Sequence, residues 1–136
     1  MSGDKHNTGK APLDLVSPLA LAYLSQVLAF GAKKYAAHNW KGGIPLSYLI
    51  AASSRHLEAI KAGIDLDAET GLPHAAHLMC ESMFILDQMN SIHHLQFDDR
   101  FQETQSKKDL LAAVLAGDVK QIQQQLLELH TLQSHI

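Results

Sequence analysis

The residues best suited to chemistry lie close together in the sequence GIDLDAETGLPHAAHLMCE, which runs from Gly63 to Glu81. Three carboxylates stand in a short loop. Pro73 then opens a helix on which two histidines and a glutamate follow at spacings i, i+3 and i+7. Residues at these spacings share one face of a helix. Carboxylate oxygens and neutral imidazoles are common metal ligands. We therefore predict a metal site with ligands drawn from Asp65, Asp67, Glu69, His74, His77 and Glu81.

The mixed donor set indicates which ions would suit this site. Carboxylate oxygens favour Mg²⁺ or Mn²⁺, and imidazole shifts the preference toward Mn²⁺, Zn²⁺ or another transition metal. His74 lies in the first helical turn, where the positive end of the macrodipole disfavours imidazolium and keeps the ring in its ligating form. The loop lacks the 12-residue spacing of an EF-hand. The alternative interpretation is that the carboxylates only cap the helix and stay solvated.

A second group precedes the loop, where Arg55 and His56 lie in the middle of another expected helix. A short connection makes the two helices antiparallel neighbours, so His56 can face the end that carries His74 and His77. His56, or a loop carboxylate such as Asp65, would serve as general base. Arg55 would bind a phosphate or hold a carboxylate. Alternatively, Arg55 only forms an ion pair and His56 is a core histidine.

A third group combines two adjacent lysines with an aromatic plate and an amide, in the sequence KKYAAHNWK from Lys33 to Lys41. Cations bind phosphates, aromatic rings stack on bases, and an amide reads a base edge. The segment therefore favours a nucleotide pocket. Two lysines near a helix C-terminus are also what macrodipole compensation alone would produce. The expected substrate-binding residues here are Lys33, Lys34, Tyr35, Asn39 and Trp40.

These groups must be positioned by helices, because alanine and leucine dominate and no strand pattern of alternating residues is present. Ser17-Pro18, Pro45 and Pro73 open three main helices that are expected to end near residues 36, 62 and 91. In the third helix, Leu78, Ile85, Leu86 and Met89 are expected to form a buried stripe. Two shorter helices follow at about 107–116 and 119–134. The predicted fold is all-α: a compact helical bundle of three main helices plus a C-terminal helix pair.

The same pattern divides the chain into parts. Residues 1–92 are expected to form a nucleotide- and metal-binding domain, and residues 93–106 a linker. Residues 107–136 would form a helical hairpin used for interaction or oligomerisation. Extra amphipathic helices make a homodimer or homotetramer plausible.

Composition narrows the class of protein. The chain has 136 residues, 46% of them hydrophobic, and a formal net charge of −3, as expected of one folded domain. Its lysines and arginines are scattered, which argues against binding a nucleic acid polymer. Cys80 is the only cysteine and is expected to be an inert core thiol, which suits a reducing compartment. No apolar run approaches the roughly 20 residues of a membrane span and no signal pattern is present, so we expect no membrane partner and a cytoplasmic location.

Several motifs together resemble one family. They are Gly9-Lys10…Asp14-Leu15, Phe30 to Tyr35, Asn39-Trp40, Arg55-His56 and the loop from Gly63 to His77. In this order they are similar to the dATP/dGTP diphosphohydrolase N-terminal family, which is widespread in bacteriophages and loosely grouped with the all-α MazG-type pyrophosphohydrolases. The resemblance covers about residues 9–90. It adds Lys10 to the expected substrate-binding residues.

The resemblance implies a reaction. Such enzymes cleave a purine deoxynucleoside triphosphate to its monophosphate and pyrophosphate with Mg²⁺ or Mn²⁺, and some serve phages that use 2-aminoadenine. Lys33, Lys34, Asn39 and Trp40 match the nucleotide-side motif, and His56, Asp65, Asp67, His74 and His77 match the acidic-histidine motif. The Glu-Glu-x-x-Glu and Glu-x-x-Asp motifs of MazG-type enzymes are absent here, and His74-x-x-His77 stands roughly where the second would be.

We therefore expect a metal-dependent purine dNTP pyrophosphohydrolase, located in the host cytoplasm if it is encoded by a phage. Two other functions fit the same residues. One is a metal phosphohydrolase of different regiochemistry, which would release single phosphates or tripolyphosphate. The other is a non-catalytic helical binding or regulatory module that holds a structural metal.

Overall fold

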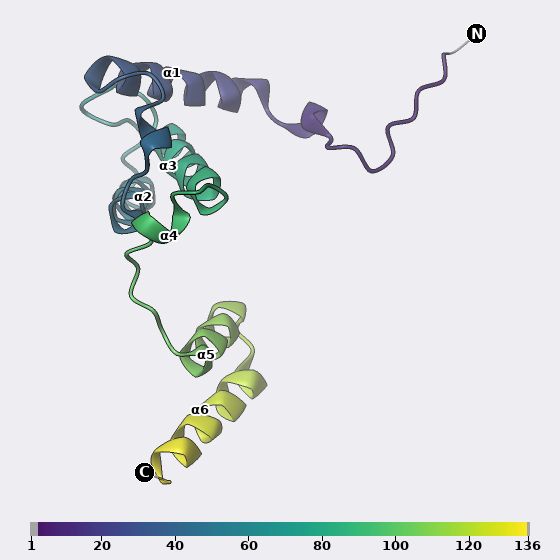
Figure 1. Ribbon diagram of the computed structural model, residues 1–136, viewed down its shortest axis with the longest axis vertical. Coiled ribbons are helices and arrows are strands. Elements are labelled where there is room, and N and C mark those ends of the chain that lie inside the picture. The colour runs from purple at the N-terminus through teal and green to yellow at the C-terminus, as the bar shows by residue number, and fades with distance from the viewer. Residues whose placement is uncertain (1–2, 136) are drawn as a thin grey trace. The chain divides into compact units, whose positions relative to one another are not determined.

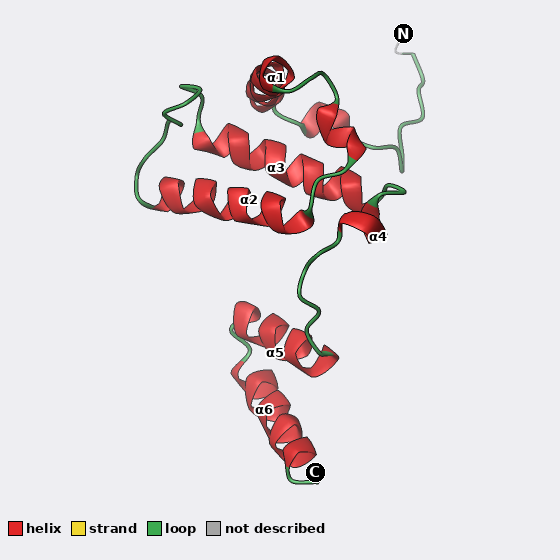
Figure 2. Ribbon diagram, turned by 60° about the vertical axis from the view of Figure 1, so that its left-hand side comes forward, coloured by secondary structure: helices red, strands yellow, loops and turns green. Residues whose placement is uncertain are grey.

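The computed structural model describes residues 3–135, and its regular elements are all helical. No strand occurs within this range, where the only β-type pairing is an isolated bridge between Leu66 and Pro73. The prediction of an all-α fold is confirmed. The elements, shown in Figures 1 and 2, are η1 (Leu13–Leu15), α1 (Pro18–Lys34), η2 (Asn39–Gly42), α2 (Leu46–Lys61), α3 (His74–Met89), α4 (His94–Phe97), α5 (Gln105–Ala116) and α6 (Val119–Gln133).

The chain divides into two compact units between Asp99 and Arg100. The first contains α1 to α4, and the second contains α5 and α6. The segment that we expected to be a linker, residues 93–106, contains the short helix α4 and the start of α5.

The three main helices begin where the sequence indicates. The Ser17 side chain caps α1 by accepting a hydrogen bond from the Ala20 amide at 3.2 Å, and Pro18 occupies the first helical position. Pro45 and Pro73 immediately precede α2 and α3. The helices end at Lys34, Lys61 and Met89, each within about two residues of the expected end.

Two helices of the first unit, α2 and α3, lie side by side (Figure 2) and run antiparallel, because residue 44 contacts residue 88 while His56 contacts His74. Helix α1 packs on α3. The core between them consists of buried Leu24, Val27, Ala76 and Cys80, surrounded by the half-buried side chains of Leu28, Leu72, Met79, Met83 and Phe84.

The predicted buried stripe of α3 is partly wrong. Leu78 and Ile85 are half-buried, but Leu86 and Met89 are exposed, at 67% and 41%. The buried positions are instead Ala76, Cys80 and Gln88, which are spaced by multiples of four. The face of α3 that contacts its neighbours is therefore rotated away from Leu86 and Met89 and toward Ala76 and Cys80, with Met79, Met83 and Phe84 at its sides.

The loop before α2 is fixed by polar side chains from α3 and from the segment after it. The buried Gln88 amide accepts a hydrogen bond from the Ile44 amide and donates one to the Ile44 carbonyl, both at 2.7 Å. Asp99 accepts a hydrogen bond from the Ser47 amide at 2.8 Å, and a second from the Ser47 hydroxyl. These bonds join three segments that are distant in sequence and set how α2 meets α3.

The second unit is a helix pair, as predicted. Thr104 caps α5, Gly117 closes it in the left-handed conformation, and the Asp118 carboxylate caps α6 by accepting a bond from the Gln121 amide at 3.0 Å. Ala113 and Gln125 are buried between the two helices. Among the described residues, no helix combines the length and the apolar character needed to cross a membrane.

Candidate active site

The acidic loop is folded back against the start of α3 by its own backbone. The Asp67 amide donates to the Leu72 carbonyl, the Gly71 amide to the Asp67 carbonyl and the His74 amide to the Asp65 carbonyl, each at 2.8 Å. These bonds close a tight turn over residues 67–72. The turn places the Asp67 carboxylate above the first turn of the histidine helix.

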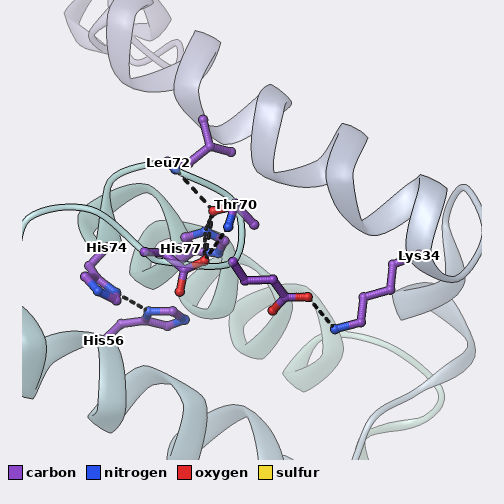
Figure 3. Close-up of polar contacts among 8 residues, drawn as sticks. Lys34, His56, Thr70, Leu72, His74 and His77 are labelled. Carbon is purple, nitrogen blue, oxygen red and sulfur yellow. Dashed lines mark hydrogen bonds and ion pairs between the residues drawn. The ribbon is translucent and has the colours of Figure 1, made fainter.

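Thr70 connects this carboxylate to the helix (Figure 3). Its amide and its hydroxyl both bond to Asp67 Oδ2, at 3.0 and 2.9 Å, and the hydroxyl oxygen lies 2.7 Å from His77 Nε2. A hydroxyl has one hydrogen to donate, and the carboxylate can only accept. We therefore assign the hydrogen of the bond between Thr70 and His77 to His77 Nε2, which leaves the lone pair on His77 Nδ1 free.

Three histidines of α2 and α3 lie together beneath the loop. His56 Nδ1 is 2.9 Å from His74 Nδ1, and the His56 ring stacks on the His77 ring with centroids 4.9 Å apart and an interplanar angle of 11°. His56, Asp67 and His74 each offer one ligand atom, and these atoms all lie within 4.8 Å of one another. We call these three residues the metal cluster.

Burial and local charge shift the pKa values of His56, His77 and Asp67 toward the forms that bind a cation. Burial lowers the pKa of His56, and the neighbouring His77 and His74 lower it further. The pKa of His77 is also lowered, again mainly by burial. Partial burial alone would raise the pKa of Asp67, but the two Thr70 hydrogen bonds and the nearby histidines outweigh it and the net shift is downward. A neutral imidazole and an ionised carboxylate are the forms in which these side chains could hold a metal ion.

A cavity of about 620 Å³ adjoins the metal cluster. Thr70 and His77 form part of its wall and contact the metal cluster, Thr70 by its hydrogen bond to Asp67 and His77 by its stacking on His56. Its aromatic wall contains Trp40 stacked on Phe84, with ring centroids 5.2 Å apart. The rest of the wall comes from the end of α1 and the residues after it, from η2, from the acidic loop and from α3, and includes Lys34, Tyr35, Asn39, Lys41, Glu69, Cys80, Glu81 and Met83.

An ion pair between two cavity residues joins α1 to the acidic loop. Lys34 Nζ lies 3.0 Å from Glu69 Oε1, and this contact raises the pKa of the lysine. Both side chains are about half exposed. Glu81, in contrast, is half-buried, and desolvation raises its pKa to about 7 although Arg55 acts in the opposite direction.

Most of the predicted site residues come together. The metal cluster and His77 form one group, and Lys34, Tyr35, Asn39, Trp40, Glu69 and Glu81 line the cavity beside it. Four others do not join either group. Lys10 donates to the His6 carbonyl in the N-terminal segment, Lys33 and Arg55 are exposed outside the cavity wall, and Asp65 takes part in the loop through its backbone oxygen.

Sequence reasoning assigned no role to Thr70, although it connects the acidic loop to the histidine helix α3. A usable signal was present, because an aspartate followed three residues later by threonine is typical of a side-chain-capped turn. The aromatic pairing of Phe84 with Trp40 was also missed. It depends on packing between η2 and α3, which local spacing does not reveal.

Comparison with known proteins identifies the family. The family described as dATP/dGTP diphosphohydrolase, N-terminal, matches residues 1–100. This chain belongs to that family. The resemblance drawn from the motifs is therefore confirmed, and the matched region ends within one residue of the end of the first structural unit.

A curated relative supports the same assignment to the dATP/dGTP diphosphohydrolase N-terminal family. The chain is 41% identical over 91 residues to the dATP/dGTP diphosphohydrolase of Salmonella phage PMBT28. The alignment covers 67% of this chain and 31% of the relative, so the chain spans about a third of that protein's length. No solved structure matches the chain.

Proposed function

We propose that this chain hydrolyses purine deoxynucleoside triphosphates to the monophosphate and pyrophosphate with the help of a divalent metal ion. The observation that supports this most directly is the junction of two features at Thr70 and His77. On one side lies an aromatic-walled cavity bordered by lysines, and on the other a cluster of imidazole and carboxylate ligands. A base, a charged phosphate chain and a metal-assisted cleavage need this combination. The name of the phage relative agrees with it.

The residues of the metal cluster fit a divalent ion. Two ring nitrogens 2.9 Å apart have a spacing close to that of two nitrogens bound to one ion, roughly 3 Å for bonds of about 2.1 Å. Asp67 adds an anionic oxygen beside them. Two imidazoles with one carboxylate favour Mn²⁺ or a similar transition metal over Mg²⁺. Such an ion would offset phosphate charge and acidify a water molecule.

Side chains of the protein would bind the base, bind the phosphates and accept the proton of the attacking water. Trp40 offers a ring face for the base, and Lys34 and Lys41 supply positive charge along the cavity wall for the phosphates. His77 supplies an unprotonated ring nitrogen where the cavity meets the cluster, as a general base requires. A water oxygen would add to the α-phosphorus as its proton passes to that base. The bond from the α-phosphorus to the bridging oxygen would break, and pyrophosphate would leave.

Product analysis tests the reaction. The purified chain is incubated with each of the four dNTPs and with Mn²⁺, Mg²⁺ or a chelator, in water enriched in ¹⁸O. We expect purine dNMP that carries the label, unlabelled pyrophosphate, and no turnover with the chelator. Release of single phosphates or of tripolyphosphate would assign the other regiochemistry. Absence of both turnover and nucleotide binding would contradict the proposal.

Substitutions at two loop carboxylates test the metal cluster. Asp67→Asn keeps the acceptor for Thr70 but removes the ligand charge, so we expect kcat/KM to fall by about 100-fold or more with helical circular dichroism unchanged. Asp65→Asn, at a side chain outside the cluster, should change kcat/KM by less than about threefold. Equal losses for both variants would place Asp65 in the site. A lower melting temperature for Asp67→Asn with full activity would favour a structural metal.

We also propose that the chain works as a homodimer or homotetramer in the cytoplasm. Large apolar side chains are exposed on α1 and α2, including Leu19 at 67% and Tyr48 at 68%. Exposed apolar groups of this size are typical of surfaces that associate. Sedimentation equilibrium over a range of concentrations gives the mass, and a monomer at all concentrations would contradict this part.

A further inference from the structure

Helix α1 has an outer face without charge. Its main neighbour is α3, and the residues that it buries are Leu24 and Val27. No charged residue occurs from Pro18 to Ala32, and both lysines of the helix come in its last turn. A helix on the surface of a globular protein usually places charged residues on the face opposite the core. The outer face of α1 therefore suits contact with another apolar surface better than contact with water.

The residues of this outer face follow a regular pattern. At spacings of 4, 3, 4 and 3 along the helix stand Leu19, Tyr23, Gln26, Phe30 and Lys33, which we call the α1 seam. Leu19 is 67% exposed and Tyr23 40% exposed, and Phe30 is half-buried. Leu24 and Val27 each come one residue after a member of the seam, so the seam lies about 100° around the helix from the core face. Alternating spacings of 3 and 4 are the pattern with which two helices pack side by side.

The α1 seam is complementary to itself when two copies meet in opposite directions. With Gln26 opposite Gln26 of the second copy, Tyr23 meets Phe30 and Leu19 meets the aliphatic stem of Lys33. A two-fold axis produces each of these unequal contacts twice. A side-chain amide both donates and accepts, so the two Gln26 side chains can bond to each other. A polar residue inside such a seam fixes the register of the two helices.

The charges at the two ends of α1 favour the same arrangement. Asp14, just before the helix, and Lys33, near its end, are both exposed. Neither forms an ion pair with another residue in the part of the chain that the structure describes. Antiparallel pairing brings Asp14 of one copy toward the end that carries Lys33 of the other. Parallel pairing would instead place lysines beside lysines, which is unfavourable.

We propose that the α1 seam binds the α1 seam of a second copy in antiparallel orientation. The inference rests on the proposed homodimer or homotetramer and names its contact surface. This surface reaches the candidate active site, because Phe30 belongs both to the seam and to the cavity wall. Tyr23 of the second copy would pack beside Phe30 and extend that wall. The second copy would therefore contribute a residue to the cavity.

A cysteine at the centre of the seam tests the pairing directly, because the native Cys80 is buried. Gln26→Cys would face the same position of the second copy, where a disulfide can form if the two Cα atoms lie within about 7 Å. Ser25→Cys is the matched control, since Ser25 is exposed on the same turn but points away from the seam. Under mild oxidation of a dilute solution, we expect covalent dimers of Gln26→Cys at least about tenfold faster than of Ser25→Cys, because paired cysteines react at a high effective concentration. Equal rates would overturn the inference.

A charge placed in the seam tests whether it holds the copies together. Tyr23→Glu should lower the mass measured by sedimentation equilibrium to about half, with helical circular dichroism unchanged because the side chain is already 40% exposed. Tyr48→Glu adds the same charge at an exposed tyrosine of α2 and should leave the mass unchanged. An oligomer that survives Tyr23→Glu would overturn the inference. So would an oligomer that dissociates only in Tyr48→Glu, because the contact would then lie on α2.

An exchange of charges tests the antiparallel direction. Asp14→Lys places a cation opposite Lys33 of the second copy and should weaken self-association by at least about threefold. Adding Lys33→Glu to the same chain restores opposite charges and should recover most of the affinity. A double variant that associates more weakly than either single variant would contradict the antiparallel arrangement.

These measurements do not depend on hydrolysis. If the chain hydrolyses no nucleotide but Gln26→Cys forms covalent dimers and Ser25→Cys does not, the hydrolase proposal fails and the seam is supported. If the wild type is a monomer at all concentrations, the seam and the proposed oligomer both fail, whatever the activity of the chain.

Discussion

At the scale of single residues, the Thr70 hydroxyl decides the state of the site. It has one hydrogen, which goes to Asp67, and its oxygen accepts from His77 and also from the Leu72 amide at 3.2 Å. The hydroxyl therefore fixes the loop turn, the position of the carboxylate and the tautomer of the histidine together. Such outer partners commonly change metal affinity or activity by 10- to 100-fold when they are removed.

Replacement of Thr70 tests this coupling. Thr70→Val has nearly the same shape but no hydroxyl, so His77 Nε2 loses its acceptor and the ring is free to change tautomer. We expect kcat to fall by about 10- to 100-fold, with a smaller loss of thermal stability. Thr70→Ser restores the hydroxyl and should recover most of the activity. If both variants lose activity equally, the methyl group rather than the hydroxyl matters.

Glu81 makes stability depend on pH. Its pKa in the folded state is raised from 4.5 to about 7, so between these values the folded chain holds a proton that the unfolded chain releases. Its favourable contribution is therefore complete below about pH 4.5 and lost as the pH rises through 7. Glu81→Gln should gain about 1 kcal/mol over the wild type on going from pH 5 to pH 8, less than the full shift implies because solvent reaches part of the side chain. Chemical denaturation of both proteins at the two pH values measures this, and a constant difference would contradict it.

At the scale of elements, the segment after α3 fixes the loop before α2. Gly43 has φ of +98°, and a Cβ atom added there would collide with the Phe97 ring of α4. Gly43→Ala should therefore destabilise the fold by about 1–3 kcal/mol, through the strained backbone and the displaced ring. The adjacent Gly42 has no heavy atom within 4 Å of an added Cβ and no positive φ, so Gly42→Ala is a matched control. Urea unfolding compares them, and equal losses would contradict the role of Phe97.

The elements were predictable where the signal is local. Ser17-Pro18, Pro45 and Pro73 mark helix starts by their own chemistry, and the antiparallel pairing of α2 and α3 follows from a short loop. The rotation of α3 about its own axis was not predictable, because it depends on which side chains fit against α1 and α2. As a result of this rotation, Leu86 is exposed.

The candidate site was also predictable only in part. Residue types and spacing along α3 and its loop suggested His74, His77 and Asp67 as one group with His56. Asp65 lies outside the metal cluster because the loop turn directs Asp67, and not Asp65, toward the histidines. Hydrogen bonds within the turn, such as that between Thr70 and His77, set this direction. Sequence spacing contains no such information. Lys34 belongs to the cavity wall and Lys33 does not, and this difference depends on how α1 is oriented against the cavity.

At the scale of the whole molecule, the matched family region and the first structural unit have nearly the same end. One finishes at residue 100 and the other at Asp99. All of the metal cluster and all of the cavity wall lie before that point. The site is therefore built entirely from the first unit.

Two truncations test which boundary is correct. A chain that ends after residue 99 keeps Phe97 against Gly43 and the bonds from Ser47 to Asp99, so it should fold and keep the activity of the full chain. A chain that ends after residue 92, the boundary expected from sequence, loses these contacts and should melt several degrees lower. Thermal melts and dNTP assays measure both. Equal stability of the two truncations would show that α4 is dispensable.

The ion pair between Lys34 and Glu69 has a consequence for how a ligand arrives. Lys34 is already neutralised by an acidic group of its own chain, so under the proposed function an incoming phosphate would exchange with that group rather than bind a free cation. An exposed pair of this kind is screened by solvent and contributes little to stability, so the exchange costs little. Glu69 would thus act as a weak internal competitor of the phosphate for Lys34. Each nucleotide that occupies the cavity would release one end of the acidic loop from α1.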